Sequence, residues 1–149
     1  MTVETISTPV PAPLSTSEER TWAMLAHLSV AVNLFTGFLG PIAALVIYLL
    51  FRDRSRYVAY HSLQAFMNQL IWWIGGPVII GTTWSVVGGL IVSIIGSPIG
   101  IILMPLACLF SVMPLVVLIQ GFWGAVKTSQ GEDFRYLWVG DWLRGTLEG

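Results

Sequence analysis

The side chains best suited to chemistry are polar groups inside an otherwise apolar stretch. His61, Gln64 and Asn68 stand at i, i+3 and i+7, a spacing that puts them on one face of a helix. Gln69 follows directly, and His27 on an earlier apolar segment is a candidate neighbour. We call these five residues the polar face. Polar side chains within a membrane usually look toward the bundle interior or a water-filled cavity, which makes them functional candidates. The alternative is that they hydrogen-bond neighbouring helices near the membrane surface.

The residue types around the polar face argue against catalysis and metal binding. Two histidines without an inward carboxylate make a weak zinc site, because zinc takes three or four protein ligands. The sequence contains no HExxH motif, no recognisable Ser-His-Asp set and no phosphate-binding glycine loop. Intramembrane acid–base chemistry would need a carboxylate within the apolar stretches, but all acidic residues lie outside them. We therefore expect a non-enzymatic protein with no cofactor and no bound metal.

The element that must position these residues is a long uncharged run. Residues 57–126 contain no Asp, Glu, Lys or Arg, whereas the outer faces of a soluble domain need charges, so the run indicates lipid as its solvent. Composition agrees, since 55% of residues are hydrophobic and 10% are charged, against about a quarter charged in soluble domains. A net charge of −1 recommends no nucleic-acid partner. The sequence predicts an all-α transmembrane bundle of about four helices, with the lipid bilayer as partner.

Residues 21–51 form the first apolar segment, and two interpretations of it remain open. A straight helix of this length would measure about 46 Å, well beyond a hydrocarbon core of about 30 Å. Gly37 and Gly40-Pro41 are placed to interrupt it, because proline cannot donate to the helix ladder. The segment is either one kinked, tilted span or a hairpin of two short helices, roughly residues 22–35 and 41–51.

A basic loop follows at Arg52, Arg54 and Arg56. One charge at mid-membrane costs roughly 2.5–3.5 kcal/mol, so this segment must lie in water. The positive-inside rule then places it in the cytoplasm. We interpret these arginines as a topology anchor. The alternative is that they bind anionic lipid headgroups or an acidic surface of a partner protein.

The uncharged run is long enough for two generous crossings. We expect them at residues 62–95, with a kink at Pro77, and at residues 99–126, because Lys127 then returns to the cytoplasmic side. Small residues recur every four positions along the first crossing and beyond it, which predicts a face for close helix packing within the protein or in a homodimer. The alternative is a pore or groove lined by this strip. The strip consists of Gly81, Ser85, Gly89, Ser93 and Ser97.

The two ends of the chain differ in character. Residues 1–17 are rich in Pro, Ser and Thr and are expected to be a disordered tail, with Ser17 as a candidate cap of the next helix. Residues 18–143 form the membrane-embedded domain, and residues 144–149 are a C-terminal tail. Aromatic rings interleaved with charges suit the headgroup layer, so the end of the chain is expected on the cytoplasmic surface. The expected interfacial anchors are Phe134, Arg135, Tyr136, Trp138 and Trp142.

Several motifs in a fixed order carry a family resemblance. They are residues 19–27 (ERTWAMLAH), Gly40-Pro41, the charged loop before His61, Gln64-Ala65, Gln69, residues 124–127 (GAVK), and the later Gly131, Glu132, Phe134, Arg135 and Tyr136. Together they resemble the Tic-twenty-like small bacterial membrane proteins, named after a subunit of the chloroplast inner-envelope translocon, over residues 18–143. The resemblance implies four helices with both termini cytoplasmic, which favours the hairpin. By analogy alone it implies a component of protein or solute passage.

Two functions from different classes follow. The first is a multi-pass protein of the cell membrane that works without catalysis, as an assembly or translocon-like component in a homo-oligomer or with other membrane proteins. The second is a small-molecule channel or transporter that uses the polar face at the start of the third helix.

Overall fold

The computed structural model describes residues 12–137 and 139–147, and every regular element within them is helical. The expectation of a disordered tail falls mostly on residues 1–11, outside the described part. The all-α prediction is confirmed. In chain order the elements are α1 (Thr16–Leu28), the 3₁₀ turn η1 (Ser29–Val32), α2 (Asn33–Thr36), α3 (Leu39–Phe51), α4 (Arg56–Val92), α5 (Ser97–Ser111), α6 (Met113–Ser129) and α7 (Val139–Leu147).

Helix α1 begins two residues earlier than the sequence suggests. Ser15 caps it, since the Ser15 hydroxyl accepts a hydrogen bond from the Glu18 backbone N–H at 3.3 Å. The Glu18 carboxylate accepts in return from the Ser15 N–H at 2.8 Å, which completes a capping box. These hydrogen bonds from Ser15 lower the pKa of Glu18 below its ordinary value. The choice of Ser17 as the cap was wrong, because Glu18 pairs with a serine three positions before it.

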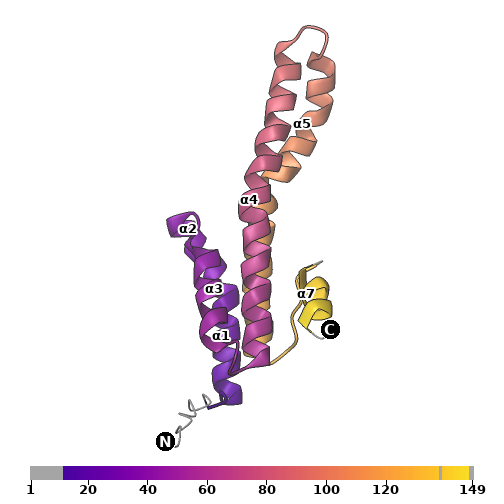
Figure 1. Ribbon diagram of the computed structural model, residues 1–149. Coiled ribbons are helices and arrows are strands. Elements are labelled where there is room, and N and C mark those ends of the chain that lie inside the picture. The colour runs from indigo at the N-terminus through magenta and orange to yellow at the C-terminus, as the bar shows by residue number, and fades with distance from the viewer. Residues whose placement is uncertain (1–11, 138, 148–149) are drawn as a thin grey trace, which may run out of the picture.

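Residues 21–51 form the hairpin rather than a single kinked span. Its first arm is α1 continued through η1 and α2, and its second arm is α3 (Figure 1). Gly37 closes the turn with φ +82°, a conformation that L side chains rarely adopt. Pro41 lies in the first turn of α3, where a missing N–H leaves no helical bond unmade. We call Thr16–Phe51 the short hairpin.

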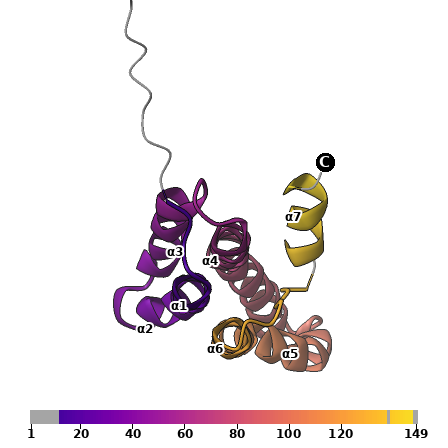
Figure 2. The ribbon, with the colours of Figure 1, turned by 90° about the horizontal axis from the view of Figure 1, so that it is seen from below.

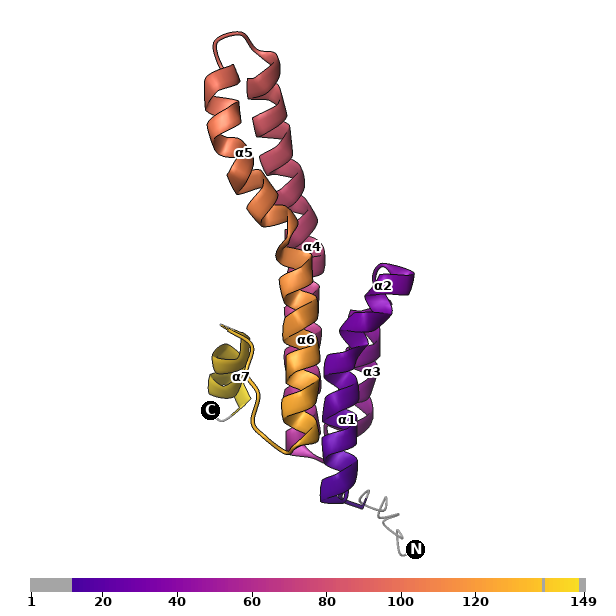
Figure 3. The ribbon, with the colours of Figure 1, turned by 180° about the vertical axis from the view of Figure 1, so that it is seen from behind.

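The uncharged run folds into a long hairpin of α4 against α5 and α6. Helix α4 and the continuous stretch Ser97–Ser129 are both long and apolar enough to cross a membrane. In the most apolar 18-residue stretch of each, only 11% is buried inside the protein, whereas the core helix of a soluble protein is mostly buried. Helix α4 continues through Pro77, whereas α5 and α6 meet at Val112, where the second arm bends (Figure 3).

The short hairpin covers one end of the long hairpin. Helix α1 packs on α6 and α4, and α3 packs on α4, as the view along the helices shows (Figure 2). Beyond α2 the α4–α5 arms project alone (Figures 1 and 3). The expected four-helix bundle therefore exists at one end of the molecule. The reason is that the arms of the short hairpin are much shorter than α4.

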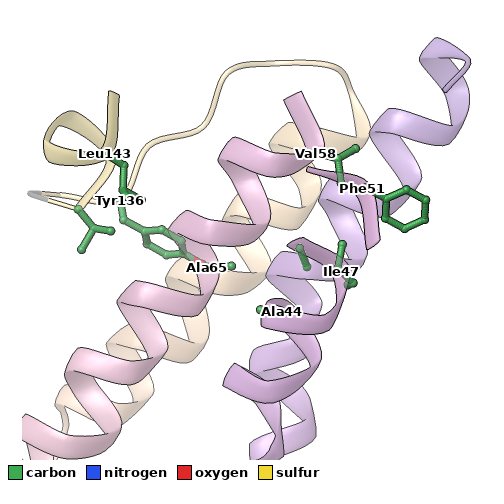
Figure 4. Close-up of a cluster of buried hydrophobic side chains, with 9 residues drawn as sticks. Ala44, Ile47, Phe51, Val58, Ala65, Tyr136 and Leu143 are labelled. Atoms are coloured by element: carbon green, nitrogen blue, oxygen red, sulfur yellow. The ribbon is translucent and has the colours of Figure 1, made fainter. Parts of the chain in front are cut away.

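The buried core lies at this same end. It joins the base of α4, the short hairpin and the chain after α6 (Figure 4). Its buried members are Ala26, Ala44, Ile47, Phe51, Val58, Ala65, Tyr136, Val139 and Leu143. Small residues on α1, α3 and α4 let the helices approach closely in this core.

The predicted strip of small residues does not pack inside the described chain. Gly81, Ser85, Gly89 and Ser93 are all exposed. The arms of the long hairpin meet instead at Gly100, where an added Cβ would lie 2.7 Å from Ile91 Cγ1. Internal packing by the strip was therefore a wrong prediction, because the strip faces away from α5. Packing in a homodimer stays a prediction.

Candidate functional site

The five residues of the polar face are all buried at the base of the long hairpin. Their exposed fractions are 0% for His27, His61 and Gln64, 4% for Asn68 and 2% for Gln69. Helix α1 contributes His27, and α4 contributes the other four. Their hydrogen bonds form two clusters, one toward the C-terminal segment (residues 130–137) and one toward the short hairpin.

Gln64 holds the C-terminal segment against α4. Its Nε2 donates to the carbonyl oxygen of Phe134 at 3.0 Å, and its Oε1 accepts from the N–H of Tyr136 at 2.7 Å. The side-chain amide thus pairs with extended backbone as a neighbouring strand would. Because the segment lies beside apolar helices, these bonds satisfy backbone groups that would otherwise be buried without partners.

Tyr136, His27 and His61 form a buried chain of polar groups. The Tyr136 hydroxyl lies 3.0 Å from His27 Nδ1, and His27 Nε2 lies 3.3 Å from His61 Nδ1. Burial raises the pKa of Tyr136, so its hydroxyl stays protonated. His61 Nε2 has no hydrogen-bond partner among the described residues. A neutral histidine has one N–H donor and one acceptor nitrogen, so the hydrogen bonds can run from Tyr136 to His61 or from His61 to Tyr136. In both cases His61 Nε2 is left without a partner.

The second cluster ties α4 to the turn of the short hairpin. Gln69 Nε2 donates to Ser29 Oγ at 2.9 Å, and Gln69 Oε1 accepts from Asn33 Nδ2 at 3.2 Å. Asn33 Oδ1 in turn accepts from the N–H of Gly40 at 2.8 Å. Ser29 and Asn33 belong to this cluster but were not predicted from the sequence. Their spacing of four within an apolar stretch was the available signal, since it puts both on one helix face.

An apolar cavity of about 310 Å³ adjoins this cluster. Gln69 and Asn33 are its polar lining residues, and Trp72, Trp73 and Pro77 contribute much of its wall. Nearby in sequence, Asn68 Nδ2 is buried without a hydrogen-bond partner among the described residues. The polar face therefore mainly contacts protein rather than an aqueous channel.

The three arginines of the basic loop have different surroundings. Arg54 Nε donates to the Ala12 carbonyl oxygen at 3.0 Å. Arg52 Nε lies 3.5 Å from Asp53 Oδ2. Arg56 is exposed and has no ion-pair partner within the described ranges. A cavity of about 720 Å³ opens beside Arg52 and Arg56, and Arg144 of α7 also lines it. We call it the basic cavity.

The expected interfacial anchors do not share one environment. Trp142 is 60% exposed and Phe134 is half-buried. Arg135 pairs with Asp141 at 3.2 Å at the surface. Tyr136 is 2% exposed and belongs to the core, so its ring does not face headgroups directly, while the depth of the expected anchors in the membrane stays a prediction. Its hydroxyl is satisfied by His27 rather than by water. Trp138 lies outside the described residues.

Within the described part of the chain, no three His, Cys, Asp or Glu side chains gather as metal ligands. His27 and His61 lie together, but among the described residues no carboxylate joins them as a third ligand. The expectation that the protein binds no metal stays a prediction.

Comparison with known proteins identifies a family. Residues 18–143 match the family model MamF/MmsF, described as the magnetosome magnetite crystal formation protein family. No curated protein and no solved structure matches the chain. The resemblance to Tic-twenty-like proteins was therefore wrong. The resemblance and the family model cover the same residues, 18–143.

Proposed function

The chain belongs to the magnetosome magnetite crystal formation protein family, and we propose that it takes part in magnetite crystal formation as a non-enzymatic component embedded in the magnetosome membrane. The observation that carries this proposal is the extent of the family match. It runs from the start of α1 to α7 and includes both candidate spans. The proposed membrane replaces the cell membrane expected from the sequence.

The apolar surface of the long hairpin supports embedding. Along the two arms, Val78, Ile102 and Ile119 are 63%, 75% and 66% exposed. In water each such side chain would forgo roughly 1.5–3 kcal/mol of burial free energy, whereas acyl chains or a partner would supply it. Both arms keep their backbone hydrogen bonds within helices, as a membrane requires.

The use of the polar face supports a role in assembly rather than catalysis or transport. Gln64 is occupied by the C-terminal segment, and Gln69 by the short hairpin. His27 is bound between Tyr136 and His61. These side chains hold three parts of the chain together, so a substrate would have to displace them.

The distribution of carboxylates supports an indirect role in mineral formation. Carboxylate and imidazole side chains are both found as iron ligands in proteins. The described carboxylates belong to the start of α1, the α3–α4 loop, the C-terminal segment and α7, at the end opposite the α4–α5 turn (Figure 1). That turn, residues 93–97, carries serine, isoleucine and glycine. We therefore propose that the protein acts through the membrane and its assemblies rather than by holding iron at this turn.

Deletion of the gene in a magnetosome-forming host, with this gene as its single family member, tests the proposal. Crystal dimensions measured by electron microscopy should change, and the wild-type gene should restore them. A fluorescent fusion should follow the magnetosome fraction. Chemical crosslinking in that membrane should capture the protein with itself or with another membrane protein. Unchanged crystals, or a fusion absent from magnetosomes, would reject the function, and a lone monomer would reject the assembly role.

A further inference from the structure

The basic cavity is built by parts of the chain far apart in sequence. It has a volume of about 720 Å³, is open to the surface, and is lined by the end of α3, the first turns of α4, the C-terminal segment and α7. Arg52 and Arg56 stand on one side, and Arg144 approaches from α7. The Arg144 guanidinium carbon lies 5.1 Å from the centre of the Tyr60 ring, which fixes this arginine against the cavity wall. The folded chain thus gathers three guanidinium groups at one opening.

The charges in the cavity do not balance. Its two carboxylates, Asp53 and Asp133, already face arginines. Arg144 Nη2 donates to Asp133 Oδ2 at 2.6 Å, and the same oxygen lies 3.5 Å from Arg135 Nε. Arg56 has no ion-pair partner among the described residues. The cavity therefore carries an excess of positive charge with unused N–H donors, which suits an anion.

The position of Arg56 strengthens this argument. It is the first residue of α4, and the first turn of that helix contains no acidic side chain. The amino end of a helix carries a partial positive charge, so a cation there is unfavourable by itself. An anion seated beside Arg56 would be attracted by both the guanidinium and the helix end.

The surroundings of the cavity indicate a lipid source for that anion. Tyr48 lines the cavity from α3, and the next residue of that helix, Leu49, is 52% exposed. A headgroup in the cavity would leave its acyl chains along this exposed side of α3. The cavity also lies at the end of the molecule that carries the charged loops, where headgroups and water meet the protein (Figure 1).

We propose that the basic cavity binds the phosphate of an anionic phospholipid headgroup, with Arg52 and Arg56 as its main ligands and Arg144 as a third. A phospholipid headgroup and a free phosphate ion would both present a phosphate group to these arginines. The experiment below distinguishes the two.

The test measures lipid retention by the purified full-length protein. Native mass spectrometry from neutral detergent would titrate phosphatidylglycerol, with phosphatidylcholine as the neutral comparison. We expect preferential retention of phosphatidylglycerol. Arg52→Gln and Arg56→Gln should each weaken it about fivefold, the effect of roughly one arginine at an anionic surface. A parallel titration with inorganic phosphate reports the free ion.

Arg54→Gln is the matched control. It removes the same charge from the same loop, but Arg54 is held by Ala12 and lies over the Phe51 ring at 5.7 Å. Its phosphatidylglycerol affinity should change less than twofold. Circular dichroism should show equal helix content in all variants, since Arg52 and Arg56 are exposed.

Each outcome decides the proposal. A loss of phosphatidylglycerol retention in the Arg52 and Arg56 variants but not in the Arg54 variant supports it. Competition of millimolar phosphate with phosphatidylglycerol would show that the site also takes the free ion. Equal retention of both lipids by the wild type overturns it. An equal loss in all three variants also overturns it, because general surface charge would then explain binding.

Discussion

At the scale of single residues, Gln64 is the side chain on which the candidate site most depends. It supplies one donor and one acceptor to the backbone of a segment seventy or more positions away. A neutral amide suits this place, because burying a carboxylate there would cost far more. The adjacent chain of Tyr136, His27 and His61 closes the same junction from the side of α1.

Gln64→Leu should release the C-terminal segment. The change leaves the Phe134 carbonyl and the Tyr136 N–H without hydrogen-bond partners, which lowers the unfolding free energy by roughly 1–3 kcal/mol for each buried group. We expect a lower unfolding temperature in detergent and faster tryptic cleavage at Arg135. Thr83→Val on the same helix is the control, because Thr83 bonds only its own helix at the Ile79 carbonyl. Equal cleavage rates in the two variants would show that Gln64 does not hold the segment.

At the scale of elements, the length of α4 has a structural explanation. Its 37 residues correspond to about 55 Å, against a hydrocarbon core of about 30 Å. Helix α7, which carries Asp141 and Arg144, packs on the base of α4, where the Tyr60 hydroxyl donates to the Gly140 carbonyl oxygen at 3.1 Å. The charges of α7 belong in the headgroup layer, so the first turns of α4 lie there too. Much of the surplus length is therefore at the charged end.

The two arms of the long hairpin should respond differently to glycine substitutions. At Gly100 a Cβ would lie 2.7 Å from Ile91 Cγ1 and 2.9 Å from the Ile91 backbone nitrogen, so Gly100→Ala must move α5 away from α4. We expect a loss of about 1–3 kcal/mol in unfolding free energy. At Gly81 nothing lies within 4 Å, so Gly81→Ala should be neutral or stabilising by up to about 1 kcal/mol. Thermal unfolding in the same detergent checks both, and a more damaging Gly81→Ala would contradict the packing of these arms.

At the scale of the whole molecule, charge and apolar surface are separated along its length. The start of α1, the basic loop and α7 share one end, and the α4–α5 turn forms the other (Figure 1). Two helices cross the distance between these ends, while the short hairpin stops part of the way. The predicted sidedness, with both termini cytoplasmic, remains a prediction.

Single cysteines test the two crossings. In a Cys108→Ala background, Asp53→Cys and Ser129→Cys should react with an impermeant maleimide from one side of sealed vesicles, because both positions are exposed at the charged end. Ile94→Cys, at a position 96% exposed in the α4–α5 turn, should react from the other side. Labelling of all three from the same side would mean that the long hairpin does not cross.

The solvent and the secondary structure could be predicted from the amino-acid sequence. A run without charges, bounded by Arg56 and Lys127, indicates lipid, and apolar helices follow because each residue contributes its transfer free energy locally. Gly37 likewise marked the interruption of residues 21–51, since a turn depends on the residues within it, although the residues alone left a kinked span and a hairpin both open. The motifs were too local to identify the family, which the match over residues 18–143 corrected.

Which polar side chains contact one another could be seen only in the folded chain. Gln64 could be assigned to a helix face from spacing alone, but its partners lie beyond α6, and no periodicity links residues that far apart. The same holds for Tyr136, whose ring suited the membrane surface until the fold placed its hydroxyl against His27. Arg144 likewise lines the basic cavity because the fold places α7 beside residues distant in sequence. Such contacts depend on how the helices pack, which is a property of the whole chain rather than of any segment.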